Sequence, residues 1–291
     1  MRVTSTHIVE LAAAATSRAQ SRVADATTIA TSGLRVQVPS DDPVAWATAQ
    51  RERMRQALAT GTGGAIASSR TDLEESDAAF ATITEVVSRA RAIAVQGASA
   101  SPTAGDRTTL ATQVTALYQE AVAAANTRGA DGHYLLAGAQ TSTQPFDDAG
   151  VYHGDANARA IASGEHLSQT VGVPGSLLTA ANGVDVLPEL AKLAAALGAN
   201  DTAGIQVSLT SLSTATSQLG LARGRAGTAL AALTSADSAR TQLQDHLTGV
   251  ISDLVEADTV GAASTLAQAT NTLAVSRAVS QHVIATLAPS S

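Results

Sequence analysis

The sequence contains no cysteine and few aromatic residues, and each shortage excludes a class of protein. Without cysteine the chain can form neither a disulfide framework nor a thiolate metal site, although this absence leaves its compartment open. Aromatic residues make up 2% of the 291 residues, whereas hydrophobic residues make up 45%. The apolar content is therefore mainly Ala, Leu and Val, which favours long helices packed through small side chains over a bulky globular core.

Long apolar runs and long basic runs are also missing. No stretch approaches the ~20 apolar residues of a membrane span, and Leu11 to Ala15 is too short and too small for a signal peptide. Acidic residues outnumber basic residues by 25 to 18, which gives a net charge of −7. We therefore expect no membrane insertion, no sequence-independent binding of nucleic acid, and no cleavable signal peptide.

Hydrophobic residues recur with helical spacing in two long segments. Between residues 66 and 97, and again between residues 205 and 254, buried-type positions repeat every seven residues, as in a coiled-coil seam. Only Arg240 interrupts the second series. The first series comprises Ile66, Leu73, Phe80, Val87 and Ala94 with Ser69, Ser76, Ile83, Ala90 and Gly97; the second comprises Ile205, Leu212, Leu219, Ala226, Leu233, Leu247 and Leu254. These segments predict the main helices of a bundle.

Weaker helical stripes lie near both ends of the sequence. The N-terminal stripe is Ile8, Leu11, Ala15, Ala19, Val23 and Ala26, and the C-terminal one is Leu266, Ala269, Leu273, Ser276, Ser280, Val283 and Leu287. Each contains too little apolar surface to stabilise an isolated helix in water. We expect the two end helices to pair with each other and to be disordered in the isolated protein.

Shorter signals divide the rest of the chain. A helix from Pro43 should end at Gly61, Gly63 and Gly64, and a capping box at Thr103 and Asp106 should open another that runs to Asn126. Four β-type pieces at 134–137, 151–153, 159–162 and 167–173 predict a β-rich insert, which is followed by a short helix ending at Gly198.

A helix break separates the first stripe from the second helix. Two prolines fix their own φ and push the preceding residues out of the α region. Gly33 should close the first helix, while Asp42 as N-cap and Pro43 at the first helical position should open the second, with Asp41 near the positive end of its dipole. The predicted hinge comprises Gly33, Pro39, Ser40, Asp41, Asp42 and Pro43.

Candidates for chemistry are few. His133, His153 and His166 lie in the predicted insert near Asp155, but their spacing matches no metal or general-base motif, so we interpret them as solvent-exposed β positions. Gly220, Gly224 and Gly227 lack the Lys-Ser/Thr of a phosphate loop, so we interpret them as sites of close helix packing. We predict no catalytic residue, no metal ligand and no cofactor, and hence no enzyme.

Three segments resemble the flagellin family. They are Met1 to Ser5, the run from Gly33 to Pro43, and Gly132 to Gly138 with Pro145-Phe146. The Pro-Ser-Asp-Asp-Pro block at residues 39–43 is the most specific part. The likeness is greatest to family members at the junction between hook and filament. It implies a mainly α, elongated antiparallel helical bundle or coiled coil, formed by pairing N- and C-terminal helices, with a small β-rich inserted domain.

The resemblance also implies three domains. Residues 1–42 and 255–291 would form a terminal coiled-coil domain for assembly, and residues 43–130 and 200–254 a helical rod. Residues 131–199 would form the β-rich insert with its short helix. Assembly and chaperone contacts would lie at Ile8, Leu11, Val23, Leu266, Leu273, Val283 and Leu287.

Function and partners follow from the same resemblance as expectations. The chain would be a non-enzymatic structural subunit connecting hook to flagellin filament, exported without a cleavable signal peptide and located in the extracellular flagellum. Its partners would be neighbouring copies in a ring, the other junction protein, flagellin, and a cytoplasmic chaperone on the C-terminal helix. The chain departs from the family at Ala288 to Ser291, where the usual apolar last residues are missing. Alternatives are a filament flagellin and, from another class, a coiled-coil scaffold or signalling rod.

Overall fold

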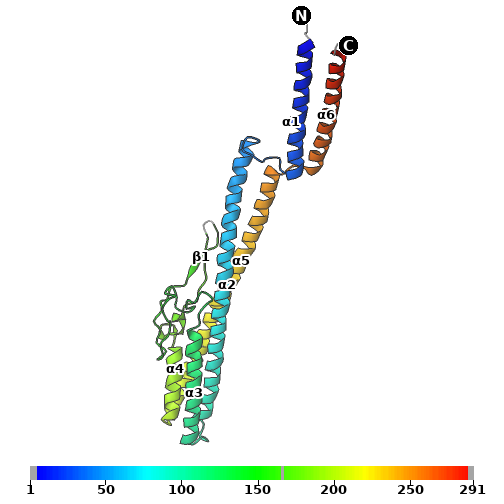
Figure 1. Cartoon of the computed structure of the whole chain (residues 1–291). Coiled ribbons are helices and arrows are strands. Elements are labelled where there is room, and N and C mark those ends of the chain that lie inside the picture. Colours follow the sequence, from blue (N-terminus) through cyan, green and yellow to red (C-terminus); the bar gives the residue numbers. More distant parts are fainter. Residues whose placement is uncertain (1–4, 165–166, 288–291) are drawn as a thin grey trace. The chain divides into compact units, whose positions relative to one another are not determined.

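The computed structural model describes residues 5–164 and 167–287, and these are mainly helical with one small antiparallel sheet (Figure 1). The predicted fold class, a mainly α bundle with a small β-containing insert, is confirmed. The helices are α1 (Ser5–Ser32), α2 (Pro43–Ala98), α3 (Ala104–Ala125), α4 (Val186–Gly198), α5 (Thr202–Val255) and α6 (Thr259–Leu287); the strands are β1 (Ala160–Ala162) and β2 (Ser168–Thr170); two 3-10 turns are η1 (Gly175–Leu178) and η2 (Ala180–Asn182).

The chain forms two compact units, and each has its own core. Unit 1 contains the described residues up to Leu58 and from Leu243 onward, and unit 2 runs from Ala59 to Gln242. Helices α2 and α5 each contribute one part to unit 1 and the other to unit 2. The three predicted domains have different boundaries, at residues 42/43 and 254/255 among others, and they stay predictions.

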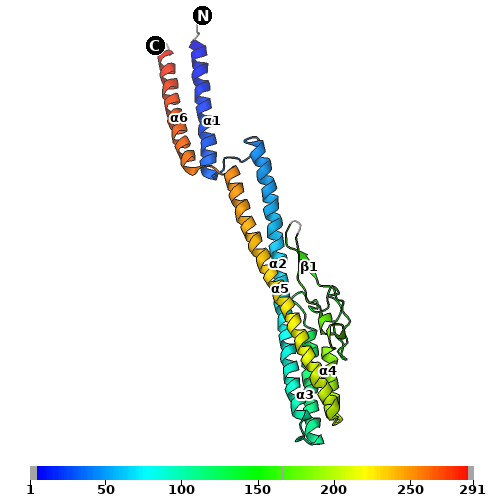
Figure 2. The same cartoon turned by 180° about the vertical axis from the view of Figure 1, so that it is seen from behind.

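The core of unit 2 is built on the predicted seam of α2. All ten seam residues between Ile66 and Gly97 are buried, and they pack with leucines and valines of α3, α4 and α5. Helices α3 and α4 lie side by side, as the rear view shows (Figure 2). At Gly97 an added Cβ would lie only 2.4 Å from Leu197 Cδ2, so glycine permits this close approach. The heptad pattern therefore identified a real packing face.

The start of α3 carries the predicted capping box. Asp106 N–H donates to Thr103 Oγ1 (3.2 Å), and Thr103 N–H donates back to the Asp106 carboxylate (2.8 Å). The hydrogen bond from the Thr103 backbone lowers the pKa of Asp106 below its usual value. Buried Arg107 follows and donates to Gly97 O (2.8 Å), Ser99 O (2.8 Å) and Asn200 Oδ1 (2.6 Å). This guanidinium satisfies carbonyls near the end of α2.

The predicted end of a helix at Gly61, Gly63 and Gly64 is wrong, because α2 continues through all three glycines. Glycine costs a helix about 1 kcal/mol per residue relative to alanine, but the packed residues that follow outweigh this local preference. Gly63 also faces Arg240, since an added Cβ would lie 3.0 Å from Arg240 Cζ. The guanidinium that interrupts the heptad of α5 therefore lies beside a residue without a side chain.

The insert contains less β structure than predicted. Strands β1 and β2 pair with Ala160 opposite Thr170, so two of the four predicted strands are confirmed in shortened form. The other two reduce to single bridges, Arg128 with Tyr134 and Phe146 with Tyr152. Leu136 and Phe146 are instead buried in the core of unit 2. In this part of the insert the side chains are buried against the helices, and strand pairing is limited to single bridges.

Buried Gln218 of α5 holds the η1–η2 region. Its Nε2 donates to Leu177 O (3.2 Å), Thr179 O (3.1 Å) and Val184 O (3.1 Å). Its Oε1 accepts from Val184 N–H (2.9 Å). One amide side chain thus satisfies four backbone groups in a region without regular secondary structure.

Unit 1 pairs α1 with α6 side by side (Figure 1). Its buried residues are mostly small: Ala19 and Ala26 on α1, and Ala269 on α6. Near the start of α2, a small cluster comprises Val36, Ala45, Ala49 and Val255, with Leu34, Trp46, Ile251 and Leu254 partly buried around it. Both ends of the described chain therefore belong to one unit, as predicted for paired end helices.

Candidate functional site

The segment between α1 and α2 is hydrogen-bonded to the end of α5. Arg35 and Val36 donate their backbone N–H groups to Val255 O, at 2.8 and 3.2 Å, and Ala257 N–H donates to Gly33 O at 2.9 Å. Leu34 and Glu256 form an isolated antiparallel β-bridge at the same place. We call residues 33–36 together with 254–257 the clasp. The clasp joins the C-terminal end of α1 to the C-terminal end of α5. The sequence did not predict this contact.

The side chain of Arg35 strengthens the clasp. Its Nη2 donates to Leu254 O (2.8 Å), and its Nη1 lies 3.4 Å from Asp42 Oδ2. The last carbonyls of a helix lack partners within the helix and carry partial negative charge. A guanidinium at this position therefore caps α5 from a part of the chain distant in sequence.

Gly33 and Asp42 take the positions that the sequence predicted at the two helix ends. Gly33 has φ +68° and donates its N–H to Ile29 O (2.9 Å), closing α1. Asp42 accepts from Ala45 N–H (3.0 Å), and α2 begins at Pro43. That backbone hydrogen bond lowers the pKa of Asp42, with Arg35 adding to the effect.

Asp41 has a different environment from the one predicted. Its carboxylate accepts from Gln37 N–H (2.9 Å) and Val38 N–H (3.0 Å), so it stabilises the preceding turn instead of the α2 dipole. Asp41 N–H in turn donates to Val38 O (3.1 Å), with Pro39 and Ser40 at the centre of the turn. The hydrogen bond from the Val38 backbone, and next the one from the Gln37 backbone, lowers the pKa of Asp41 below its usual value. The role of these residues as a hinge stays a prediction.

The predicted stripe on α1 is correct in its second half and wrong in its first. Ala19, Val23 and Ala26 lie in the seam with α6, whereas Ile8 and Leu11 are exposed by 37% and 56%. The half-buried positions there are Val9, Ala12, Ala14 and Thr16. Thr16 Oγ1 and Ser280 Oγ are 2.8 Å apart, and Ser280 also donates to Ala12 O. Hydroxyl groups set the register where the apolar pattern is too weak.

On α6 the predicted stripe faces α1 as far as side chains are described. Leu266, Leu273 and Val283 are half-buried, whereas the side chain of Leu287 lies outside the described part. Large apolar side chains also point away from the pair, among them Val260, Val275, Val279 and Ile284. Together with Ile8 and Leu11, these residues leave the two end helices with several large apolar side chains in water.

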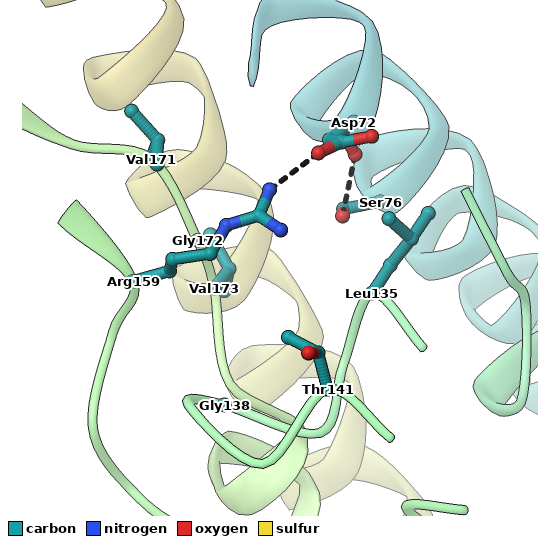
Figure 3. A pocket seen from close by; sticks show the side chains of 9 residues that line it. All are labelled: Asp72, Ser76, Leu135, Gly138, Thr141, Arg159, Val171, Gly172 and Val173. Carbon is teal, nitrogen blue, oxygen red and sulfur yellow. Dashed lines mark hydrogen bonds and ion pairs between the residues drawn. The ribbon is translucent and has the colours of Figure 1, made fainter. Parts of the chain in front are cut away.

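Among the histidines of the insert, His133 differs from the prediction of an exposed position. His133 is 13% exposed and lies 3.3 Å from Asp72 Oδ2 and 2.9 Å from Arg159 Nη1. Arg159 points from the insert toward Asp72 on α2 and pairs with it (Figure 3). The cavity beside them is only about 10 Å³, room for about one water. Asp72 and Arg159 thus connect the insert to α2, and no sequence motif had indicated either residue.

The remaining candidates carry no chemistry of their own. His153 is exposed, as predicted, and lies 2.9 Å from Asp147, whereas His166 falls outside the described residues. Asp155 accepts from Ala139 and Asn157 backbone N–H groups. The predicted close packing at Gly220, Gly224 and Gly227 is wrong, since all three are exposed and an added Cβ would meet no atom within 4 Å.

Across 5–164 and 167–287, no group of three His, Cys, Asp or Glu side chains is arranged to hold a metal ion. In the same ranges, no helix combines the length and apolarity needed to cross a membrane.

Known proteins resemble the chain in both sequence and fold. Residues 4–141 match the family described as the bacterial flagellin N-terminal helical region. Flagellar hook-associated protein 3 of Salmonella typhimurium is 33% identical over 127 residues, which cover 42% of this chain and 39% of that protein. The Escherichia coli protein of the same name is 32% identical over 131 residues, covering 43% of this chain and 40% of that protein.

The matched segment therefore spans about two fifths of the length of each of these relatives. Among solved structures, Xanthomonas campestris FlgL has a TM-score of 0.61 at 18% identity, covering 68% of this chain and 98% of that one. At this identity, the similarity to the solved structure is a similarity of fold alone. Sequence and fold agree: residues 4–141 are similar to the flagellin N-terminal helical region, and the chain is similar in sequence to flagellar hook-associated protein 3 and in fold to FlgL.

Proposed function

We propose that this chain is a structural subunit of the bacterial flagellum that connects the hook to the flagellin filament. The names of its sequence relatives supply the role. One observation on the chain itself carries the proposal: α1 and α6 bury alanine between them and expose Leu11, Val275 and Val279 to solvent. Helices of this kind gain their stability from neighbours in an assembly.

The exposed apolar residues provide the surface for assembly. Neighbouring copies in a ring cover Ile8 and Leu11, and the other junction protein and flagellin contact the same ends of the chain. The half-buried seam residues Val23, Leu266, Leu273 and Val283 hold α1 against α6 once assembly has ordered both helices. In this role the protein is a scaffold and no enzyme.

Export and protection precede assembly. The chain passes unfolded through the flagellar export apparatus, without a cleavable signal peptide, and reaches the extracellular flagellum. A cytoplasmic chaperone holds the segment of α6 beforehand, because Leu266, Leu273 and Val283 form an apolar stripe when α1 is absent. The turn at residues 37–42 acts as a hinge that sets the direction of α1 relative to the start of α2.

Electron microscopy of a deletion strain tests the junction role. Cells that lack this chain should carry hooks without filaments and should shed flagellin into the medium. Filaments of normal length on the deletion strain would refute the proposal. A filament flagellin, the alternative, predicts bare hooks with no shed flagellin, and a scaffold or signalling rod predicts normal filaments.

A charge placed on the exposed surface tests the assembly role. Leu11→Asp adds a carboxylate at a position that is solvated in the monomer, so the protein should fold and be secreted but should not support filaments. Gln20→Asp adds the same charge at another exposed position of α1 as the matched control. Equal motility of the two variants would show that Leu11 contacts no neighbour.

A further inference from the structure

A basic and apolar face lies on the first turns of α2. Val44, Arg51 and Leu58 are seven residues apart, and Arg55 follows Arg51 by one turn, so all four share one side of the helix. Val44 and Leu58 are exposed by 77% and 65%. Arg51 donates to Thr48 Oγ1 (3.1 Å), and Arg55 lies 3.3 Å from Glu52 with its side chain 58% exposed. We call these four residues the basic face.

An acidic face lies on the last turns of α5. Asp245, Gly249 and Asp253 follow one another at four-residue spacing and are all exposed. Within the described ranges, neither aspartate takes part in an ion pair or a side-chain hydrogen bond. An added Cβ at Gly249 would meet no atom within 4 Å. We call these three residues the acidic face.

The two faces cannot meet within one molecule. Helices α2 and α5 pack in unit 1 through other positions, namely Ala45, Ala49 and Val255, and Gln56 donates to Thr248 at 2.9 Å. The basic and acidic faces point away from this contact. Each face is therefore available to a second molecule.

The two faces are complementary in charge. Arginine is enriched at protein interfaces, and Val44 and Leu58 add exposed apolar surface beside the two arginines. Glycine in an exposed helix interior lowers helix stability, and Gly249 meets nothing in its own molecule that would require it. Between two carboxylates, it leaves room for a neighbouring helix to approach.

We propose that the basic face of one copy packs against the acidic face of the next copy. This contact is head-to-tail, and repeating it with a suitable rotation closes a ring. The inference rests on the proposed function, because it names the lateral contact of that ring. The partner is a second copy of this chain.

Charge reversal of each face provides the test. Arg51→Glu with Arg55→Glu makes both faces acidic, and Asp245→Arg with Asp253→Arg makes both basic, so neither variant should form the contact with itself. Co-expression of the two variants restores an alternating contact, and a chain with all four changes restores it with exchanged signs. In a strain lacking the native chain, we expect each single-face variant to reduce the motile fraction at least about tenfold. The mixture and the fourfold variant should recover it.

Site-directed cross-linking detects the contact itself, because the chain has no native cysteine. Met54→Cys combined with Gly249→Cys should give disulfide-linked multimers on isolated hooks, and Val207→Cys on unit 2 combined with Gly249→Cys serves as the matched control. Single-face variants that swim normally, or single-face defects that neither the mixture nor the fourfold variant repairs, would overturn the inference. Either result leaves the deletion phenotype unchanged, so the junction role and this contact fail separately.

Discussion

Units 1 and 2 contain similar amino acids but bury different ones. Unit 2 buries Phe80, Leu212 and many other large side chains around a core shared by α2, α3, α4 and α5. Unit 1 buries chiefly alanine, and only a small cluster around Val36 and Val255 forms a core there. Of the sixteen large hydrophobic residues that are exposed in the described ranges, eleven belong to unit 1, although it is the smaller unit.

This contrast separates stability within one chain from stability that depends on neighbours. Burial of a large apolar side chain contributes about 1.5–3 kcal/mol, and burial of alanine contributes much less. Unit 2 therefore has the means to fold by itself. Unit 1 leaves many of its large apolar side chains exposed, so burial within the chain stabilises it less.

Amide exchange of the purified protein should show the largest difference between the units. Residues 5–32 and 259–287 should exchange almost as fast as an unfolded chain, because their seam buries little area. Amides around Leu212 and Phe80 should exchange about ten-thousandfold more slowly, which corresponds to about 5 kcal/mol of local stability. Strong protection in α1 and α6 of the isolated protein would contradict the comparison.

Truncation of one large side chain in each unit should give unequal costs. Phe80→Ala leaves a cavity in the core of unit 2 and should lower its free energy of unfolding by about 3–5 kcal/mol. Leu273→Ala in the half-buried seam of α6 should cost about 1 kcal/mol or less. Calorimetry of both variants measures the two effects, and equal costs would show that unit 1 has a core of its own.

A buried polar side chain should also matter more in unit 2 than an exposed one. Gln218→Leu removes four hydrogen bonds to backbone groups of residues 177–184 and should cost about 2 kcal/mol or more. Gln206→Leu, at an exposed position of the same helix, is the matched control and should change stability little. Denaturant unfolding followed by circular dichroism compares them, and similar midpoints would mean that water replaces Gln218.

Glycine-to-alanine changes should give the smallest effects, with opposite signs on buried and exposed faces of unit 2. Gly224→Ala should stabilise α5 by about 0.5–1 kcal/mol, because a Cβ there meets nothing. Gly97→Ala places a Cβ against Leu197 and should destabilise the unit by about 1 kcal/mol or more. Thermal unfolding of both variants reads the sign, and stabilisation by Gly97→Ala would show that this packing is loose.

Sequence periodicity predicted the packed face of α2 because large residues define it. Leu73, Phe80 and Ile83 have few acceptable positions other than a core. On α1 the predicted stripe is Ile8, Leu11, Val23 and three alanines, and alanines also lie on the other faces of the helix, so the apolar pattern does not fix the register. The hydroxyl pair of Thr16 and Ser280 sets the register, and such a pair is visible only when both helices are placed.

Contacts between distant parts of the chain were beyond prediction for the same reason. The N-cap at Asp42 and the capping box at Thr103 involve neighbours in sequence, and both were found. The pairing of Asp72 with Arg159 joins residues 87 positions apart, and nothing local distinguishes either one. The wrong helix end at Gly61 to Gly64 shows the reverse error, where a local preference was read without the packing that overrides it.

The clasp has a consequence for the order in which the protein folds. It joins Arg35 to Leu254, residues 219 positions apart, so a loop of that length must close before the clasp forms. A chain that emerges from its N-terminus keeps the clasp open until the residues after Leu254 have emerged. Closure of the clasp therefore requires that α5 is present to its end: a molecule interrupted earlier in synthesis cannot form it, however well its unit 2 has folded.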